Sequence, residues 1–128
     1  ELDQSETYEA LTAYRRFLED HPSSPMVSVA QERIVACRER LAKKEFLGAQ
    51  LYHRQGHLEA ARMSYDQLLL SFPDTDWYLQ GLVHLGLLER DEGGLEAARL
   101  HWQQVVDNTQ DDELRAQVRG WLTDLDTP

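Results

Sequence analysis

The sequence has 128 residues, of which 41% are hydrophobic, and its 13 Lys and Arg against 23 Asp and Glu give a formal net charge of −10. This length and apolar content suit a single domain with a buried core, so we expect residues 1–128 to fold as one domain. The negative charge argues against nucleic acid or an anionic membrane surface as a partner, and no apolar run is long enough to cross a bilayer.

The first predicted helix runs from about residue 6 to residue 20. Ser5 suits its N-cap, and Pro22 ends it. Apolar side chains at helical spacing form the expected inner face: Tyr8, Leu11, Tyr14, Phe17 and Leu18.

The longest predicted helix covers about residues 25–55. Ser24 and Pro25 suit a helix start, no proline follows, and Gly48 is the single glycine before Gly56. Small and apolar residues recur at steps of three and four up to residue 41, and the stripe then continues to residue 52: Val27, Ala30, Ile34, Cys37, Leu41, Gly48 and Tyr52. At 1.5 Å per residue such a helix spans roughly 45 Å, so we expect neighbouring helices along both halves of it.

Four shorter helices follow in the prediction. Gly56 ends the long helix, and a helix over about residues 58–72 is closed by Pro73. The residues 74–76 can cap a helix that reaches about Arg90. Gly93 and Gly94 then break the chain again. The last two helices cover about 95–106 and 111–125, and Asp111 caps the second of them. No segment alternates with period two, so we predict an all-α fold of about six helices.

Two parts of the sequence repeat each other at a shift of 37 residues. The string LEAAR at residues 58–62 recurs at 95–99, and further pairs match at the same shift: Gly56 with Gly93, Tyr65 with Trp102, and Leu68 with Val105. This order of glycine, large apolar residue, alanine and aromatic resembles the tetratricopeptide repeat, in which small residues such as Ala49 and Gly86 let two helices approach closely. We therefore expect a tetratricopeptide-like α-solenoid.

The first predicted helix matches the third at a longer shift of 51 residues. Three pairs define this shift: Tyr14 with Tyr65, Phe17 with Leu68, and Pro22 with Pro73. The excess of 14 residues is about four helical turns and lies between residues 22 and 56. This insertion is an independent reason to expect one extended helix.

The long helix also carries a more specific pattern. Arg-Leu-Ala at 40–42 is followed by Glu45-Phe46, Ala49 and Tyr52, and Phe-Pro-Asp-Thr at 72–75 follows the next helix. This pattern resembles the carboxy-terminal half of the BamD family, tetratricopeptide-type lipoproteins of the outer-membrane β-barrel assembly machinery, over about residues 8–107. The resemblance implies a non-enzymatic scaffold, without cofactors, on the periplasmic face of the outer membrane.

The same resemblance implies a partner and a mode of membrane attachment. The carboxy-terminal repeats of that family dock on a periplasmic POTRA domain of the barrel-forming subunit. A lipidated cysteine and further repeats lie upstream of the part that resembles this sequence, so we expect membrane contact only through such a lipid anchor. The segment 111–126 has no counterpart in the family pattern.

A basic cluster on the long helix is the predicted partner-binding site. The expected contact residues are Arg33, Arg40, Lys43 and Lys44, in a chain that is otherwise strongly acidic. Arg33, Arg40 and Lys44 follow at steps of seven and four and so share one helical stripe, and an arginine there could bind a partner carboxylate in bidentate fashion. The alternative is that these side chains are solvated and pair with acids of the same protein.

Other chemistry is weakly supported. His53 and His57 have a spacing that could bind a metal, but Gly56 is expected to end the helix between them, so we expect no metal site. Cys37 falls on the apolar stripe, which predicts burial rather than catalysis; as a single cysteine it leaves both cytoplasm and periplasm open. The alternative function is a general tetratricopeptide adaptor, in the cytoplasm or elsewhere, that binds a peptide or protein.

Overall fold

The computed structural model describes residues 4–127, and six α-helices make up most of this part of the chain. Their bounds are α1 (Gln4–Asp20), α2 (Val27–Arg54), α3 (Leu58–Ser71), α4 (Trp77–Asp91), α5 (Leu95–Asn108) and α6 (Asp112–Leu125). No β-strand occurs within residues 4–127. The predicted all-α class, the six helices and the extended second helix are confirmed.

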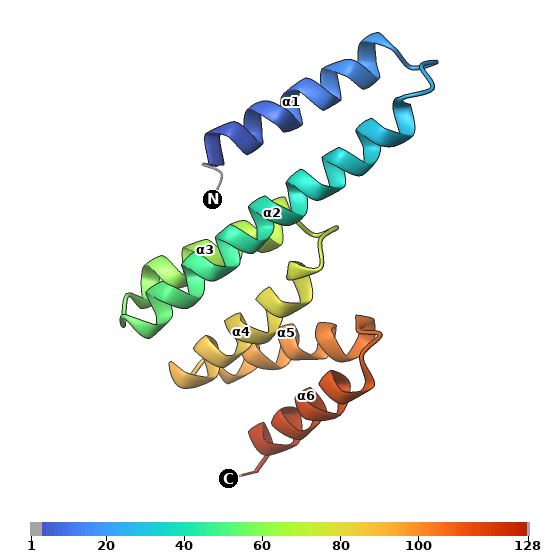
Figure 1. Ribbon diagram of the computed structural model, residues 1–128. Coiled ribbons are helices and arrows are strands. Elements are labelled where there is room, and N and C mark those ends of the chain that lie inside the picture. Colours follow the sequence, from blue (N-terminus) through green and yellow to red (C-terminus); the bar gives the residue numbers. More distant parts are fainter. Residues whose placement is uncertain (1–3, 128) are drawn as a thin grey trace.

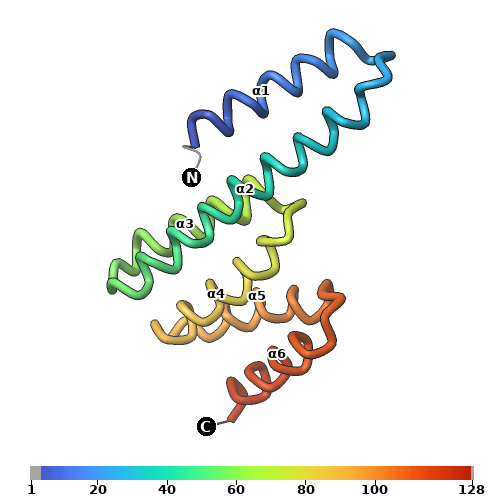
Figure 2. Tube along the Cα trace, viewed as in Figure 1, coloured from blue at the N-terminus to red at the C-terminus, as the bar shows by residue number. Residues whose placement is uncertain are grey.

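Helix α2 is continuous over 28 residues, about 42 Å, and packs on helices along both halves. Figure 1 and Figure 2 show α1 running beside its amino-terminal half and α3 beside its carboxy-terminal half. Side chains from these three helices share one core, which includes Leu11, Leu41, Phe46 and Tyr65. The long helix is therefore stabilised by two consecutive neighbours, as its length requires.

The remaining helices continue the stack in chain order. Helix α4 packs on α3 and α5, and α6 packs on α5. Leu85 and Leu88 of α4 belong to the first core, whereas Leu82 and Val83 belong to a second core with residues of α5 and α6. Helix α4 thus joins the two cores, and the stack is consistent with a tetratricopeptide-like solenoid. None of these helices, within the described residues, combines the length and the apolar composition needed to cross a bilayer.

The repeated small and glycine positions have the roles that the pattern predicts. Gly56 and Gly93 have φ of 80° and 85°, a left-handed conformation that ends α2 and α4 and turns the chain into the next helix. Ala49 is fully buried. At Gly86 an added Cβ would lie 2.1 Å from Nε1 of Trp102, so only glycine fits there with the indole in its present position.

Some predicted details of the first helix and of the α2 start are wrong. Ser5 lies inside α1 instead of capping it, because the helix already begins at Gln4. Tyr8 is 51% exposed, and Thr7 is buried in its place, since Thr7 keeps the helical phase of Leu11. Helix α2 begins at Val27, and the hydroxyl of Ser24 accepts the Met26 N–H at 3.1 Å in the preceding turn.

The predicted caps of the two later helices have different outcomes. Asp111 caps α6 as expected, since its carboxylate accepts the N–H groups of Glu113 and Leu114 at 3.0 and 3.2 Å. Asp76 is the N-cap residue of α4 but makes no side-chain cap hydrogen bond. The hydroxyl of Thr75 instead donates to the Phe72 carbonyl at 2.9 Å, so the prediction that residues 74–76 cap α4 through their side chains is wrong.

Candidate partner-binding site on the long helix

The four predicted contact residues are all exposed on α2, and three of them line one groove. This groove, which we call the α2 groove, has a volume of about 920 Å³ and is lined by Glu39, Arg40, Lys43, Lys44, Leu47, Gly48, Leu51 and Trp77. Arg33 lies two turns before Arg40 and does not line it. The structure therefore brings Arg40, Lys43 and Lys44 together and leaves Arg33 beyond the end of the groove.

The apolar part of the α2 groove was missing from the sequence prediction. Leu47 and Leu51 are 47% and 46% exposed, although both are large aliphatic side chains. Trp77, the first residue of α4, forms part of the lining from the neighbouring element, and the Lys43 ammonium lies 6.0 Å from the centre of its ring. The step of seven from Arg33 to Arg40 leads on to Leu47, so the sequence contained a signal for one of the apolar lining residues.

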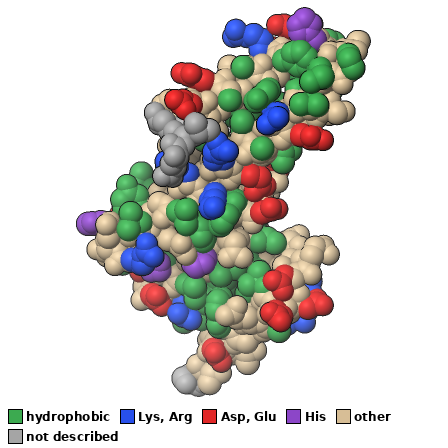
Figure 3. All heavy atoms as spheres, viewed as in Figure 1, with side chains coloured by type: hydrophobic (Ala, Val, Ile, Leu, Met, Phe, Trp, Pro, Cys, Tyr) green, Lys and Arg blue, Asp and Glu red, His purple; other side chains and the backbone are tan. Residues whose placement is uncertain are grey.

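Arg33, Arg40 and Lys43 are available for a charged partner. Within residues 4–127, no carboxylate forms an ion pair with Arg33, Arg40 or Lys43. In the face shown in Figure 3, Lys and Arg side chains lie beside hydrophobic ones near the middle of the molecule, whereas acidic side chains gather over the end of α5 and the start of α6. The charge along α2 is thus locally opposite to the net charge of the chain.

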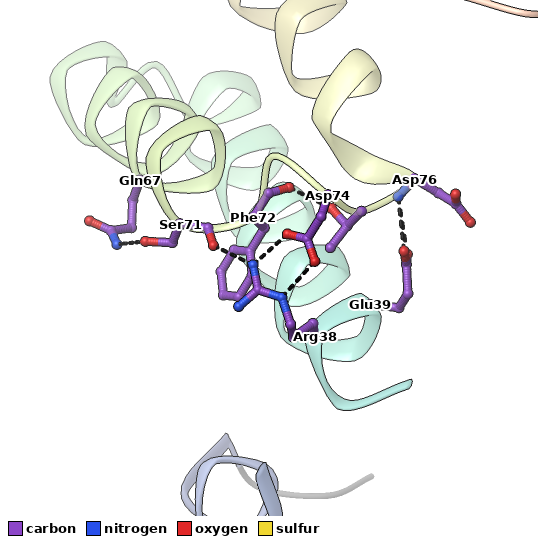
Figure 4. A network of polar contacts seen from close by, with 8 residues as sticks. Arg38, Glu39, Gln67, Ser71, Phe72, Asp74 and Asp76 are labelled. Carbon is purple, nitrogen blue, oxygen red and sulfur yellow. Dashed lines mark hydrogen bonds and ion pairs between the residues drawn. The ribbon is translucent and has the colours of Figure 1, made fainter. Parts of the chain in front are cut away.

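Two neighbouring residues of α2, Arg38 and Glu39, hold the loop between α3 and α4 (Figure 4). The Arg38 guanidinium donates to the Ser71 carbonyl at 2.7 Å and to both carboxylate oxygens of Asp74, one of them at 2.8 Å. The Glu39 carboxylate accepts the Asp76 N–H at 3.0 Å. We call this arrangement the Arg38–Glu39 clasp.

The clasp fixes one wall of the α2 groove. Its contacts end at Asp76, the residue before Trp77, so they set where α4 begins relative to α2. Glu39 supplies from another helix the acceptor for the N-cap N–H of α4, the role that a Glu at the third helical position has in a capping box. The hydrogen bond from Arg38 also lowers the pKa of the Asp74 carboxyl, which keeps that carboxylate charged and bound to Arg38.

The other candidate residues are not brought together. Gly56 separates His53 from His57, and the ring of His57 lies against Tyr52, 6.4 Å between centres. No group of three His, Cys, Asp or Glu side chains in residues 4–127 is arranged to hold a metal ion. Cys37 is partly buried and packs against the first core beside Ile34.

The chain matches a known protein family. A family model described as YfiO, outer membrane lipoprotein, matches residues 1–101. The match covers α1 to α4, the whole α2 groove and the first half of α5, and it leaves α6 outside. A search of curated proteins found no matching relative.

Proposed function

The chain belongs to the YfiO family of outer membrane lipoproteins, and from this membership we propose that it is a non-enzymatic scaffold for outer-membrane protein assembly. Its proposed partner is a periplasmic POTRA domain of the barrel-forming subunit, bound through the α2 groove. The outer-membrane family favours the periplasmic face of that membrane over the cytoplasmic alternative.

The observation that carries this proposal is the combination of charge and apolar surface in the α2 groove. Protein interfaces commonly have an apolar centre with polar groups around it, and arginine is enriched among the residues that contribute most to affinity. Leu47, Leu51 and Trp77 supply the apolar part, and Arg40 supplies a bidentate donor for a partner carboxylate. Seven of the eight residues that line the groove belong to α2, the longest helix of the described residues.

A charge reversal at Arg40 tests the proposed contact. We expect Arg40→Glu to weaken binding to a POTRA domain at least about tenfold, which corresponds to about 1.4 kcal/mol, because an attractive charge becomes a repulsive one. The melting temperature should stay the same, since Arg40 is exposed and makes no ion pair within the described residues. Affinity is measured by isothermal titration calorimetry and stability by circular dichroism.

The matched control is Arg119→Glu, an exposed arginine on α6 that lies far from the groove in the chain and outside the family match. It changes the net charge by the same amount and should leave affinity within about twofold. Equal affinities of the Arg40 and Arg119 variants would reject the α2 groove as the docking site. Arg33→Glu tests the fourth predicted residue and should have a smaller effect than Arg40→Glu, because Arg33 lies beyond the groove.

A general tetratricopeptide adaptor is the second candidate. The exposure of Leu47 and Leu51 favours it, because a peptide could cover these side chains as well as a folded domain could. Binding to an array of unrelated peptides, with none to POTRA domains, would support the adaptor over the assembly scaffold.

A further inference from the structure

One exposed stripe of α2 has the spacing of a helix-packing seam. Residues on it follow at steps of three and four, and all are exposed: Arg33, Ala36, Arg40, Lys43, Leu47 and Leu51. This is the spacing with which one helix packs along another, as in a coiled coil. The opposite stripe of α2, with Leu41, Phe46 and Ala49, already packs in the first core. The exposed seam is therefore a second face of the same helix, bordered by Trp77 at the start of α4.

The chemical pattern along the seam is symmetrical. Met26, the N-cap residue of α2, extends the seam seven residues before Arg33, and Arg40 and Leu47 follow at further steps of seven. Two guanidinium groups therefore lie between two exposed apolar side chains. Glu39 is the acidic residue of the groove lining, and its carboxylate is turned to the α3–α4 loop, where it accepts the Asp76 N–H. The seam thus offers positive charge in its centre and apolar contact at its ends.

We propose that the element which docks on this seam is an acidic amphipathic α-helix. It carries two carboxylates seven residues apart, opposite Arg33 and Arg40, with one large apolar residue seven positions before the first carboxylate and another seven positions after the second. The proposal rests on the proposed function and deepens it, because it names the part of the partner that enters the site. Helices that dock in grooves use side chains at these spacings.

Geometry favours a helix over a strand as the occupant. Arg33 and Arg40 are seven residues apart, about 10 Å along α2. On a partner helix, residues seven apart have the same separation and the same face. On a strand, 10 Å corresponds to about three residues, and residues three apart point to opposite faces of the strand. A strand therefore cannot direct two carboxylates at both arginines with matching separation.

Three synthetic peptides of about 26 residues test the proposal on the full chain. The first is helix-favouring, with Glu at two positions seven apart, Leu seven positions before the first Glu and Leu seven positions after the second. The second has the same composition with the two Glu five residues apart, which places them on different faces of the helix. The third keeps the first pattern but has a central proline, which breaks the helix. Binding is measured by fluorescence anisotropy, and peptide helicity by circular dichroism.

We expect the first peptide to bind at least about tenfold more tightly than either of the others and to gain helicity when bound. Changing the Glu opposite Arg40 to Arg should abolish binding to the wild-type chain and restore it to Arg40→Glu, which fixes the register. Equal binding of the three peptides, no binding of the first, or no rescue by the charge swap would overturn the proposal.

This outcome is separable from the proposed function. A POTRA domain that binds in an Arg40-dependent manner while all three peptides fail would leave the scaffold function standing and reject the helix as the docking element. The reverse result, with the first peptide bound and POTRA domains not bound, would keep the helix seam and reject the assembly partner.

Discussion

The hairpins α2–α3 and α4–α5 repeat each other at a shift of 37 residues, yet they pack their central aromatic side chains differently. In the first hairpin Tyr65 is fully buried, and the repeat position of its partner helix is Ala49. In the second, Trp102 occupies the same repeat position, and Gly86 leaves the space that the larger indole needs. Trp102 donates its Nε1–H to the Val83 carbonyl at 3.1 Å, whereas the Tyr65 hydroxyl has no hydrogen-bond partner in the described structure.

The loops that follow the two hairpins also differ in which residue donates hydrogen bonds to the carbonyl groups at the helix end. Helix carboxyl ends leave carbonyl oxygens without donors in the helix itself. After α3, the donor is Arg38 from the long helix, which binds the Ser71 carbonyl. After α5, the donor is Arg115 of the next helix, which binds the carbonyls of Val106 and Thr109.

This difference between the two loops shows what the additional turns of α2 contribute. Asp74 and Asp111 are equivalent at the shift of 37, but Asp74 binds Arg38 whereas Asp111 caps its own helix. Residues 27–39 are the part of α2 that α4 lacks, and Arg38 and Glu39 are its last two residues. The insertion therefore supplies contacts to the α3–α4 loop as well as an exposed surface.

The largest effect on stability is expected when Gly86 of the second hairpin is replaced by alanine, the residue at the equivalent position of the first hairpin. Gly86→Ala places a Cβ 2.1 Å from Nε1 of the buried Trp102, so the indole must move and lose its hydrogen bond to Val83. We expect a loss of about 3 kcal/mol in the free energy of unfolding, measured by urea denaturation. Adding Trp102→Tyr recreates the Ala–Tyr pair of the first hairpin and should recover part of the loss.

Gly48→Ala is the matched control for that substitution, because nothing lies within 4 Å of the added Cβ. It should stabilise α2 by up to about 1 kcal/mol, the usual gain from replacing glycine inside a helix. A Gly86→Ala variant as stable as the wild type would contradict the proposed role of the close approach.

A smaller effect on stability is expected from removing Arg38, the donor that α2 supplies to the α3–α4 loop. Arg38→Ala leaves the Ser71 carbonyl and the Asp74 carboxylate without this partner, and should cost about 1–2 kcal/mol in the free energy of unfolding. Arg119→Ala, on an exposed face, should change stability by less than about 0.5 kcal/mol. Equal urea midpoints for the two variants would show that the Arg38–Glu39 clasp does not stabilise the fold.

The pH dependence of stability should depend on a histidine that sits at the repeat position of Leu47. His84 is partly buried, with its ring 5.0 Å from that of Phe46, and burial, followed by the charge of His53, lowers its pKa below the ordinary 6.5. Below about pH 6.5 the unfolded chain binds this proton more readily than the folded one. Stability due to neutral His84 is therefore complete above that pH and is lost as the pH falls through the lowered pKa.

Urea midpoints at pH 7.5 and 5.5 measure this dependence. His84→Gln should decrease the difference between the two midpoints, whereas His57→Gln, at an exposed position, should not. A wild-type difference that persists unchanged in His84→Gln would assign the pH dependence to other groups.

The smallest effect is expected at the buried tyrosine. Burial raises the pKa of Tyr65 to about 12, and its hydroxyl is buried without a hydrogen bond in the described residues. Tyr65→Phe removes that hydroxyl and keeps the ring, so the free energy of unfolding should stay equal or rise by up to about 1 kcal/mol. A loss of more than 1 kcal/mol would show that the hydroxyl has a stabilising partner.

The sequence predicted the helices well because their breaks are chemically explicit. Gly56, Gly93 and Pro73 mark chain reversals, and the 14-residue difference between the two repeat shifts predicted a single long helix. The sequence specifies the helical phase at the amino-terminus less clearly, and the expectation that Tyr8 lies on the inner face is wrong. A change of one residue turns a side chain by about 100° around a helix.

The candidate site could be predicted only in part. Arg40, Lys43 and Lys44 share a short segment, so their clustering is visible in the sequence. Trp77 joins them from another helix through the contacts of Arg38 and Glu39 with residues 71–76, which depend on tertiary structure. Arg38 lies within the same basic segment, and only its contacts distinguish this structural arginine from its exposed neighbours.

Within residues 4–127, helix α1 packs chiefly on α2. A helix with one neighbour can detach in a local opening that leaves the rest of the chain folded, and such openings need less free energy than global unfolding. The amino-terminal half of α2 would then be exposed on a further side while its carboxy-terminal half stayed held by α3. Among residues 4–127, local opening should therefore begin at α1 and leave the two hairpins packed.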